Sequence, residues 1–513
     1  MRPWLREVVQ RIRTIPIYRY TALVVAAALV FGLVVLTRAL LHDDRSCAAG
    51  VARPEDSGEC VGVSTSAFDF GQRQFADTIR AVARENSKLK PGTYVTVALF
   101  EPFTATDADT MNDVRHELQG AYLAQYHSNH DDNGETPYIR LVLANPGASG
   151  AYWERTVDRI VTMTTSSDRL RAVTGIGTST DNNKKAVAKL TRLGVPVIGT
   201  SITADDLANG QRGKDPYPGL ARVAPTNTDE ARALASFAKV TADRALLVYD
   251  KPGDPYTKTL QQAFSTLLKG SPYGSWPFTP PADRSQEGST PNTFRQITDL
   301  ICDTDARLDT VFFAGRHTQL RQFINALGRR GCQSRSFTVL TGDEGSYLTG
   351  DKKLDRSALQ HGVAVRYTSL AHPDAWLDKP PATGGSAQST KELDQLLTAA
   401  KTRPVGPIGA VSLDDGQAII AYDAMRLAVH GVREATPDQQ KIPPLADVGL
   451  QWPQVKGSLR VNGVSGWICL DVHGNPYDKA VPIVELTPQG GSRFVKIAWP
   501  EDRPPAKDCL PPA

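Results

Sequence analysis

Hydroxyl side chains recur directly after apolar segments that read as strands. In an open α/β sheet the carboxyl ends of the strands form the edge where ligands bind, and the helices that start there present N–H groups to anions such as carboxylates. The same hydroxyls can act as helix N-caps alone, which requires no ligand. Since all would converge on one edge, they are candidate ligand contacts. They are Thr104 and Thr106, then Thr178, Ser179 and Thr180, and then Thr200, Ser201 and Thr203.

Other reactive side chains complete no catalytic or cofactor motif. A Gly-Lys pair at positions 213 and 214 is followed by Asp215, so a phosphate-binding loop lacks its hydroxyl ligand for magnesium. Gly175 and Gly177 lie between a strand and a helix, but Thr180 replaces the third glycine of a dinucleotide fingerprint. No Gly-x-Ser-x-Gly nucleophile motif occurs. We therefore expect no enzyme activity and no cofactor.

Clustered histidines and carboxylates have structural interpretations. His127 and His130 could bind a metal at a helix end, but a solvated helix terminus is favoured because no third ligand is fixed by spacing. Paired carboxylates in loops or at helix starts favour capping over acid–base chemistry. These pairs are Asp131 with Asp132, Asp205 with Asp206, and Asp414 with Asp415. No metal site is expected.

The composition excludes several classes of protein. The 513 residues contain 58 Lys plus Arg against 55 Asp plus Glu, giving a net charge of +3, with 41% hydrophobic and 22% charged residues. This balance is ordinary for globular domains and argues against nucleic-acid binding and bulk disorder. The length suggests two to four domains.

The first forty residues indicate a membrane anchor. Residues 1–19 carry five arginines and precede a run from Tyr20 to Thr37 without charge. A span over 20–41 would leave 1–19 cytoplasmic and place the body outside the cell membrane as a single-pass protein. A cleaved signal peptide ending near Cys47 and a lipoprotein modified at that cysteine are the alternatives.

Six cysteines in an extracytoplasmic body predict disulfides. Fifteen pairings are open to six cysteines, and we expect pairing between nearest neighbours. Cys302 and Cys332 are the best-supported pair because each follows a helical run and precedes a strand, which places both on one rim of a sheet. The expected pairs are Cys47–Cys60, Cys302–Cys332 and Cys469–Cys509.

From Thr93 onward, short apolar runs alternate with amphipathic helical patterns. This alternation predicts an α/β fold with parallel sheets covered on both faces, and it restarts after Ala242 as a second, similar lobe. The expected strands are 94–100, 139–144, 171–176 and 195–198, then 245–249, 308–314 and 337–340, and late strands at 466–472, 481–486 and 494–497. The expected helices are 113–126, 152–163, 182–193, 228–240, 256–268, 319–327, 391–400 and 413–429. The polar, Pro-rich stretches 271–291 and 372–407 are interpreted as surface insertions.

Several local patterns resemble the type I periplasmic binding protein family, in its branch of branched-chain amino acid receptors for ABC importers. They are the helix segment 119–124, the strand 172–179 ending in glycine and hydroxyls, the Val-Pro-Val-Ile segment 195–201, the strand 246–250 with Tyr256, and Tyr422-Asp423-Ala424. The resemblance covers about 93–486. It implies two Rossmann-like lobes joined by a hinge with three crossings, and a ligand in the cleft between them.

The resemblance also implies domain bounds and site residues. It divides the chain into an N-terminal extension at 42–92, lobe 1 at 93–241, lobe 2 at 242–367, a return to lobe 1 at 368–432, and a segment at 433–513 that completes lobe 2 and ends in a Pro-rich tail. Ser179, Thr180, Ser201 and Thr203 would bind the ligand from lobe 1 together with Thr104. From lobe 2, Tyr256 would cover the ligand, Glu344 would face its ammonium, and His317 or Arg316 would be a further contact. Arg316 is a departure, because receptors for aliphatic amino acids lack this cation, and it leaves the identity of the ligand open.

Three functions fit the sequence. The favoured one is a membrane-tethered solute-binding protein that passes a small polar, amino acid-like ligand to an ABC permease and ATPase or to a signalling partner. The alternatives are a protein-interaction scaffold on the same fold and a hydrolase or transferase without a recognisable motif. No nucleic-acid partner is expected.

Overall fold

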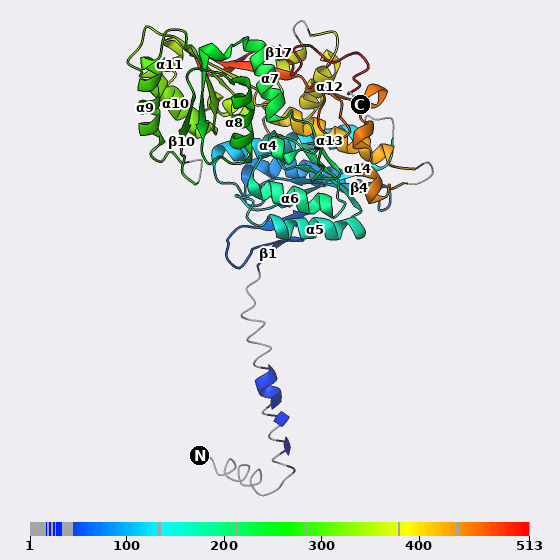
Figure 1. The fold of residues 1–513 in the computed structure, drawn as a ribbon. Coiled ribbons are helices and arrows are strands. Elements are labelled where there is room, and N and C mark those ends of the chain that lie inside the picture. Colours follow the sequence, from blue (N-terminus) through cyan, green and yellow to red (C-terminus); the bar gives the residue numbers. More distant parts are fainter. Residues whose placement is uncertain are drawn as a thin grey trace, which may run out of the picture.

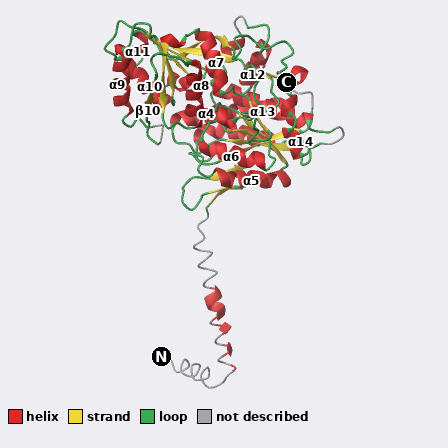
Figure 2. Cartoon of the chain, viewed as in Figure 1, coloured by secondary structure: helices red, strands yellow, loops and turns green. Residues whose placement is uncertain are grey.

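The computed structural model describes residues 17, 20, 21, 24, 25, 27–32, 45–130, 135–211, 213–282, 286–377, 380–437 and 441–511. Two α/β lobes make up the body, with α5 and α6 on lobe 1 and α9, α10 and α11 on lobe 2 (Figure 1). Each lobe is a sheet between layers of helices (Figure 2). The described part of the chain includes no helix that is both long and apolar enough to span a membrane. Most of the predicted span at 20–41 lies outside the described residues.

Lobe 1 contains an eight-stranded sheet in the order β1-β2-β3-β5-β4-β6-β7-β8. Strands β4 to β8 are parallel, whereas β1, β2 and β3 form an antiparallel extension beside β5. The strands are β1 Ser46–Ala48, β2 Val51–Ala52, β3 Val61–Ser64, β4 Tyr94–Phe100, β5 Tyr138–Asn145, β6 Leu170–Gly175, β7 Val197–Gly199 and β8 Leu220–Arg222. The helices are α3 Ala76–Asn86, α4 Ala108–His130, α5 Trp153–Thr165, α6 Asp181–Arg192, α12 Ala387–Ala399, α13 Gln417–Glu434 and α14 Leu445–Gly449.

Lobe 2 contains a seven-stranded sheet in the order β10-β9-β11-β12-β13-β16-β17. Its first five strands are parallel, and β16 and β17 are antiparallel to them and to each other. The strands are β9 Ala245–Asp250, β10 Ser275–Phe278, β11 Thr310–Ala314, β12 Phe337–Thr341, β13 Val363–Thr368, β16 Val481–Leu486 and β17 Ser492–Ala498. A separate hairpin of β14 Val461–Gly463 and β15 Gly466–Ile468 packs against lobe 1. The helices are α7 Asn227–Ala238, α8 Pro255–Leu267, α9 Thr290–Asp303, α10 His317–Gly328 and α11 Ser357–Gln360, with the 3-10 helix η4 Asp343–Thr349.

The central strands explain the layered packing. Along β4, Val97 and Leu99 face one apolar cluster, and Ala98 and Phe100 face another on the opposite side of the sheet. This period of two follows from the alternation of side chains along a strand. The same alternation along β9 divides lobe 2 between clusters formed with α9 and α10 and with α7 and α8. Helix α7, which we expected in lobe 1, therefore packs in the core of lobe 2.

The chain passes between the sheets three times, after β8, after β13 and after β15. Helix α13 returns to lobe 1 and packs along α4, where a Cβ on Gly120 would lie 2.1 Å from the carbonyl oxygen of Ala418. Only glycine permits this approach of two helices. The expected pairs Cys47–Cys60, Cys302–Cys332 and Cys469–Cys509 all form disulfides.

Two buried side chains of opposite charge, Asp423 and Lys479, are bridged by Ser465 and attach the C-terminal segment to lobe 1. Asp423 of α13 accepts hydrogen bonds from the N–H groups of Val464 (2.8 Å) and Ser465 (2.7 Å). Lys479 donates to Ser465 Oγ at 2.8 Å and to the carbonyl of Gly466 at 3.3 Å. Asp423 and Lys479 are 0% and 2% exposed, so neither charge is solvated by water.

We expect Asp423→Ala to lower the free energy of unfolding by about 3–5 kcal/mol, because it removes the acceptor of the bonds from Val464 and Ser465 and the negative charge that favours the buried Lys479 ammonium. Chemical denaturation of the variant and of the exposed control Asp394→Ala measures this effect. The control should change stability by less than about 0.5 kcal/mol. A similarly small effect at Asp423 would contradict the structural role of the pair.

Candidate functional site

Lobe 2 side chains contact lobe 1 across the interlobe cleft at several points, among them Thr259, whose Oγ1 accepts from the N–H of Asp205 at 3.3 Å. Arg316 donates through Nη2 to the carbonyl oxygen of Ser179 at 3.1 Å. His317 Nε2 lies 3.5 Å from an oxygen of Asp109, and the Tyr347 hydroxyl donates to Asp113 at 2.5 Å. These contacts hold the cleft closed.

Glu344 organises the lobe 2 side of these contacts. Its Oε1 accepts from Arg316 Nη1 at 2.5 Å, and its Oε2 accepts from the backbone N–H of His317 at 2.9 Å and lies 2.7 Å from His317 Nδ1. Burial opposes the charge of Glu344, but Arg316 and His317 outweigh burial and lower the pKa of this carboxyl to about 2. Burial likewise opposes the charge of His317, yet Asp109 and Glu344 raise the pKa of the imidazole to about 10.

The lobe 1 wall contains a buried pair of carboxyl groups, Glu101 and Glu117. Glu117 accepts from Thr200 Oγ1 at 2.8 Å and lies 2.9 Å from Ser201 Oγ. Burial raises the pKa of both carboxyls, and for Glu101 the adjacent Glu117 raises the pKa further. Such a pair holds a proton more tightly than an isolated carboxylate.

Two glycines make room for this acid pair. Gly175 has φ +94°, and a Cβ there would lie 2.6 Å from Glu101 Oε1. A Cβ on Gly177 would lie 2.9 Å from Glu117 Oε1. The Gly-x-Gly sequence after β6 therefore serves close approach to carboxyl groups and not to a phosphate.

A second acid pair, Glu230 and Asp343, lies on the lobe 2 side. Glu230 accepts from Thr368 Oγ1 at 2.7 Å, and burial with the nearby Asp343 raises its pKa well above the usual value. Burial, and next the charge of Glu344, raises the pKa of Asp343 to about 7. Tyr256 is 2% exposed, and the guanidinium of Arg316 lies 4.7 Å from the centre of its ring.

Several buried polar atoms in this region have no hydrogen-bond partner among the described residues. They are Glu101 Oε1, Thr203 Oγ1, Asp205 Oδ1, Glu230 Oε1 and Asp343 Oδ1. Arg222, whose charge lies near Asp205, also leaves Nε and Nη2 without partners. Because buried polar groups are almost always hydrogen-bonded, this concentration points to a site that a polar ligand can complete.

The hydroxyls expected to contact a ligand have different roles. Ser179 Oγ accepts from the N–H of Ala204 at 3.2 Å, and Ser201 also lies 2.7 Å from Gln417 Oε1. These two residues and the unpartnered Thr203 share the same edge of the lobe 1 sheet. The sequence therefore located a polar edge, but it did not reveal that Ser201 faces a carboxyl group.

The hydrogen bonds of Thr180 and Thr104 stay within lobe 1. Thr180 caps α6 by accepting from the N–H of Asn183 at 3.2 Å. Thr104 donates to Glu59 at 2.6 Å and accepts from Asn145 at 3.1 Å. Neither bond involves lobe 2.

A cavity of about 190 Å³ lies at the mouth of the cleft and is lined from both lobes. Asp109 and Asp113 of α4 and Asp414 and Asp415 before α13 line it from lobe 1, and Tyr347 lines it from lobe 2. The approach to the cleft is therefore acidic.

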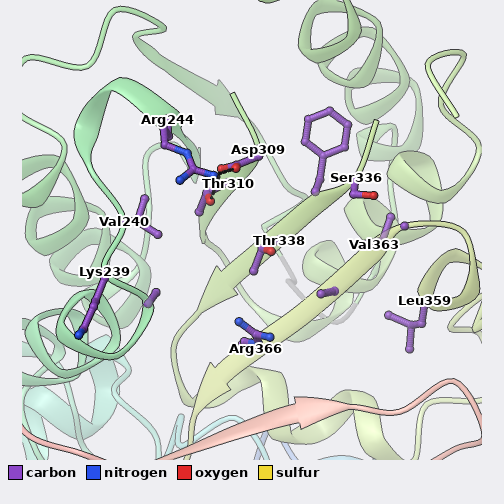
Figure 3. A pocket seen from close by; sticks show the side chains of 14 residues that line it. Lys239, Val240, Arg244, Asp309, Thr310, Ser336, Thr338, Leu359, Val363 and Arg366 are labelled. Carbon is purple, nitrogen blue, oxygen red and sulfur yellow. Dashed lines mark hydrogen bonds and ion pairs between the residues drawn. The ribbon is translucent and has the colours of Figure 1, made fainter. Parts of the chain in front are cut away.

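A separate cavity of about 440 Å³ lies at the other edge of the lobe 2 sheet (Figure 3). Thr310, Thr338 and Val363 line it, and they are at the amino ends of β11, β12 and β13. Its Arg244 pairs with Asp309 and its Arg366 with Glu485, so the charges of these arginines are already compensated. It is not part of the interlobe site.

Glu101, Asp113 and Glu117 were not predicted as site residues from the sequence. A signal for Glu117 was present, because it falls among Val114, Leu118 and Ala121 on the apolar stripe of α4. A carboxyl group on a buried helical face requires partners, and this makes it a candidate site residue.

We expect His317→Gln to destabilise the protein by about 1.5–3 kcal/mol at pH 6, because a charged hydrogen bond to Glu344 is lost. The pKa of His317 is higher in the folded protein, at about 10, than in the unfolded chain, at about 6.5. Its charged hydrogen bond therefore stabilises the fold fully below about pH 6.5, and this stabilisation is lost as the pH rises through about 10. Denaturation of wild type and variant at pH 6 and pH 10 should show the difference shrinking at the higher pH. An equal difference at both values would mean that His317 is not charged in the folded protein.

Comparison with solved structures identifies the architecture. A leucine-binding protein of Thermotoga maritima matches with a TM-score of 0.57 and 15% identity over 80% of this chain and 100% of its own. A branched-chain amino acid transporter substrate-binding protein of Streptococcus pneumoniae, in complex with isoleucine, matches with a TM-score of 0.53 and 17% identity over 79% and 99%. A solute-binding protein of an ABC transporter of Rhodopseudomonas palustris, in complex with 3,4-dihydroxybenzoic acid, matches with a TM-score of 0.52 and 15% identity over 79% and 97%. No protein-family model and no curated protein matches the sequence. The chain therefore has the fold of the type I periplasmic binding proteins, the solute-binding components of ABC transporters.

Proposed function

We propose that this chain is an extracytoplasmic solute-binding protein that captures a small, amine-bearing ligand between its lobes for an ABC importer or a sensor. The observation that carries the proposal is the concentration of buried, unpartnered carboxyl oxygens in the cleft, on Glu101 and Asp205 in lobe 1 and on Glu230 and Asp343 in lobe 2. An ammonium group offers three N–H donors and a compensating charge. It is therefore the type of group that this set of oxygens would accept.

The fold supports capture between lobes. The structural matches are named as binding proteins for leucine, isoleucine and aromatic acids, so one architecture holds ligands of different chemistry. In this chain the cleft presents an excess of carboxyl groups. The nearby cations Arg316 and His317 already pair with Glu344, and the charge of Arg222 lies near Asp205. This balance favours a cationic group on the ligand over a lone carboxylate.

Raised carboxyl pKa values give the proposal a pH signature. A carboxyl group that holds a proton in the free protein must release it to pair with an ammonium group, and Asp343, with a pKa of about 7, titrates in the accessible range. Binding should therefore release protons near neutral pH and weaken as the pH falls below 7.

The test is a thermal-shift screen of the purified chain against amino acids, diamines, other small amines and aromatic acids, followed by calorimetric titration. We expect amines to bind and Asp343→Asn to weaken their binding roughly ten- to hundred-fold, as expected for loss of a hydrogen bond to a charged group. Asp394→Asn is the matched control, since it makes the same change at an exposed carboxyl group on α12, and it should leave affinity unchanged. Binding of aromatic acids without amines would contradict the ligand class. Absence of any ligand would favour the alternative of a protein-interaction scaffold.

The membrane tether is a separate part of the proposal. It rests on the arginine-rich segment 1–19 and the uncharged run that follows. All six cysteines of the chain are in disulfides, so an introduced cysteine provides a single site for a thiol reagent.

We expect a cysteine introduced by Leu5→Cys to be protected from an impermeant thiol reagent in intact cells and to react once the membrane is opened. A cysteine introduced by Lys185→Cys, on the exposed face of α6, should react in intact cells. Labelling of both positions from outside would contradict the predicted topology.

A further inference from the structure

The guanidinium of Arg316 is enclosed in the manner of a bound organic cation. Its Nε donates to Asp254 at 2.9 Å, its Nη1 donates to Glu344, and its Nη2 donates to the carbonyl of Ser179 at 3.1 Å. The face of Tyr256 lies against it, with 4.7 Å from ring centre to guanidinium carbon. Two carboxylates, one carbonyl and one aromatic face are the features by which proteins recognise amines and guanidines.

These partners come from three separate parts of the chain. Asp254 and Tyr256 belong to the start of α8, Glu344 to η4, and Ser179 to the loop before α6 in the opposite lobe. Arg316 precedes α10 as its N-cap residue, and its side chain makes no capping bond there. The guanidinium is therefore held by its surroundings and not by its own helix.

We infer that Arg316 is the specificity-determining residue of the cleft, because its guanidinium occupies a cation subsite formed by Asp254, Glu344, Tyr256 and the Ser179 carbonyl. The subsite accepts planar guanidinium-type cations and, by the same contacts, amines. This inference rests on the proposed function for the identity of the natural ligand, which must displace Arg316 or bind beside it. The existence of the subsite does not depend on that ligand.

Occupation by Arg316 has consequences for selectivity. A ligand cation competes with an internal group, so its apparent affinity is reduced by the fraction of molecules in which the subsite is filled. A ligand without a cationic group cannot form the hydrogen bonds that Arg316 makes in the subsite, and so it cannot displace Arg316 in this way. Arg316 also donates one of the hydrogen bonds between the lobes. A ligand that displaces Arg316 therefore removes a contact across the cleft.

The experiment removes the internal cation and supplies a free one. Arg316→Ala truncates the side chain and leaves its partners in place. Arg366→Ala is the matched control, because this arginine lies in the same lobe, pairs with Glu485 and is partly exposed. Wild type and both variants are titrated with methylguanidinium chloride at millimolar concentration, against sodium chloride at equal ionic strength, by calorimetry and thermal melting.

We expect methylguanidinium to bind Arg316→Ala at least about ten times more tightly than wild type and to raise its melting temperature, while Arg366→Ala behaves as wild type. Equal responses of the two variants, or no binding to Arg316→Ala, would overturn the inference. If Arg316→Ala does not fold alone, refolding with and without methylguanidinium is the readout, and folding only with the cation supports the subsite. Refolding that is indifferent to the cation counts against it.

The amines that bind wild type in the ligand screen form a second arm. They should bind Arg316→Ala more tightly than wild type, because the internal competitor is absent. If no amine binds either protein while methylguanidinium binds Arg316→Ala, the proposed function fails and the subsite stands. If amines bind wild type but neither they nor methylguanidinium gain affinity in Arg316→Ala, the subsite fails and the proposed function stands.

Discussion

The buried carboxylate of Glu344 is the interaction on which the closed arrangement of the lobes depends. A carboxylate that is 5% exposed remains ionised only if cations and hydrogen-bond donors replace water, and here Arg316 and His317 do so. Both residues also contact lobe 1, at Ser179 and Asp109. The charge of Glu344 is therefore compensated within lobe 2, and it positions Arg316 and His317, two of the side chains that cross the cleft.

The acid pairs on either side of this cluster give the cleft its chemical character. Glu101, Glu117 and Glu230 are buried, and Asp343 is half-buried, at positions where an apolar wall would cost less free energy. On lobe 1, Gly175 and Gly177 let the backbone lie close to the carboxyl groups of Glu101 and Glu117. Contacts that only join two lobes do not require these buried carboxyl groups. A protein that binds and releases a polar ligand can use them both to hold the ligand and to release it.

Much of the fold was predictable, because parallel strands and amphipathic helices have clear periodicities. The parallel strands β4, β5, β6, β9, β11 and β12 were expected within a few residues of their observed bounds. The edge strand β10 was missed because Pro277 and polar neighbours hide its pattern, and an edge strand tolerates proline.

The site was only partly predictable. That Glu344 faces a ligand ammonium stays a prediction, and its pairing with Arg316, 28 residues earlier in the chain, was not predicted. The two residues meet because they follow β11 and β12, which are neighbouring strands of the sheet. No local sequence pattern predicts such a pairing.

The most direct test of the closed, Glu344-centred cleft is the distance between the lobes in solution. Spin labels introduced at Lys185 on α6 and Asp299 on α9 report this distance by double electron–electron resonance. The account predicts one narrow distance distribution for the otherwise wild-type chain and a second, longer distance when Glu344→Gln removes the charge that holds Arg316 and His317. Identical distributions with and without the substitution would contradict it.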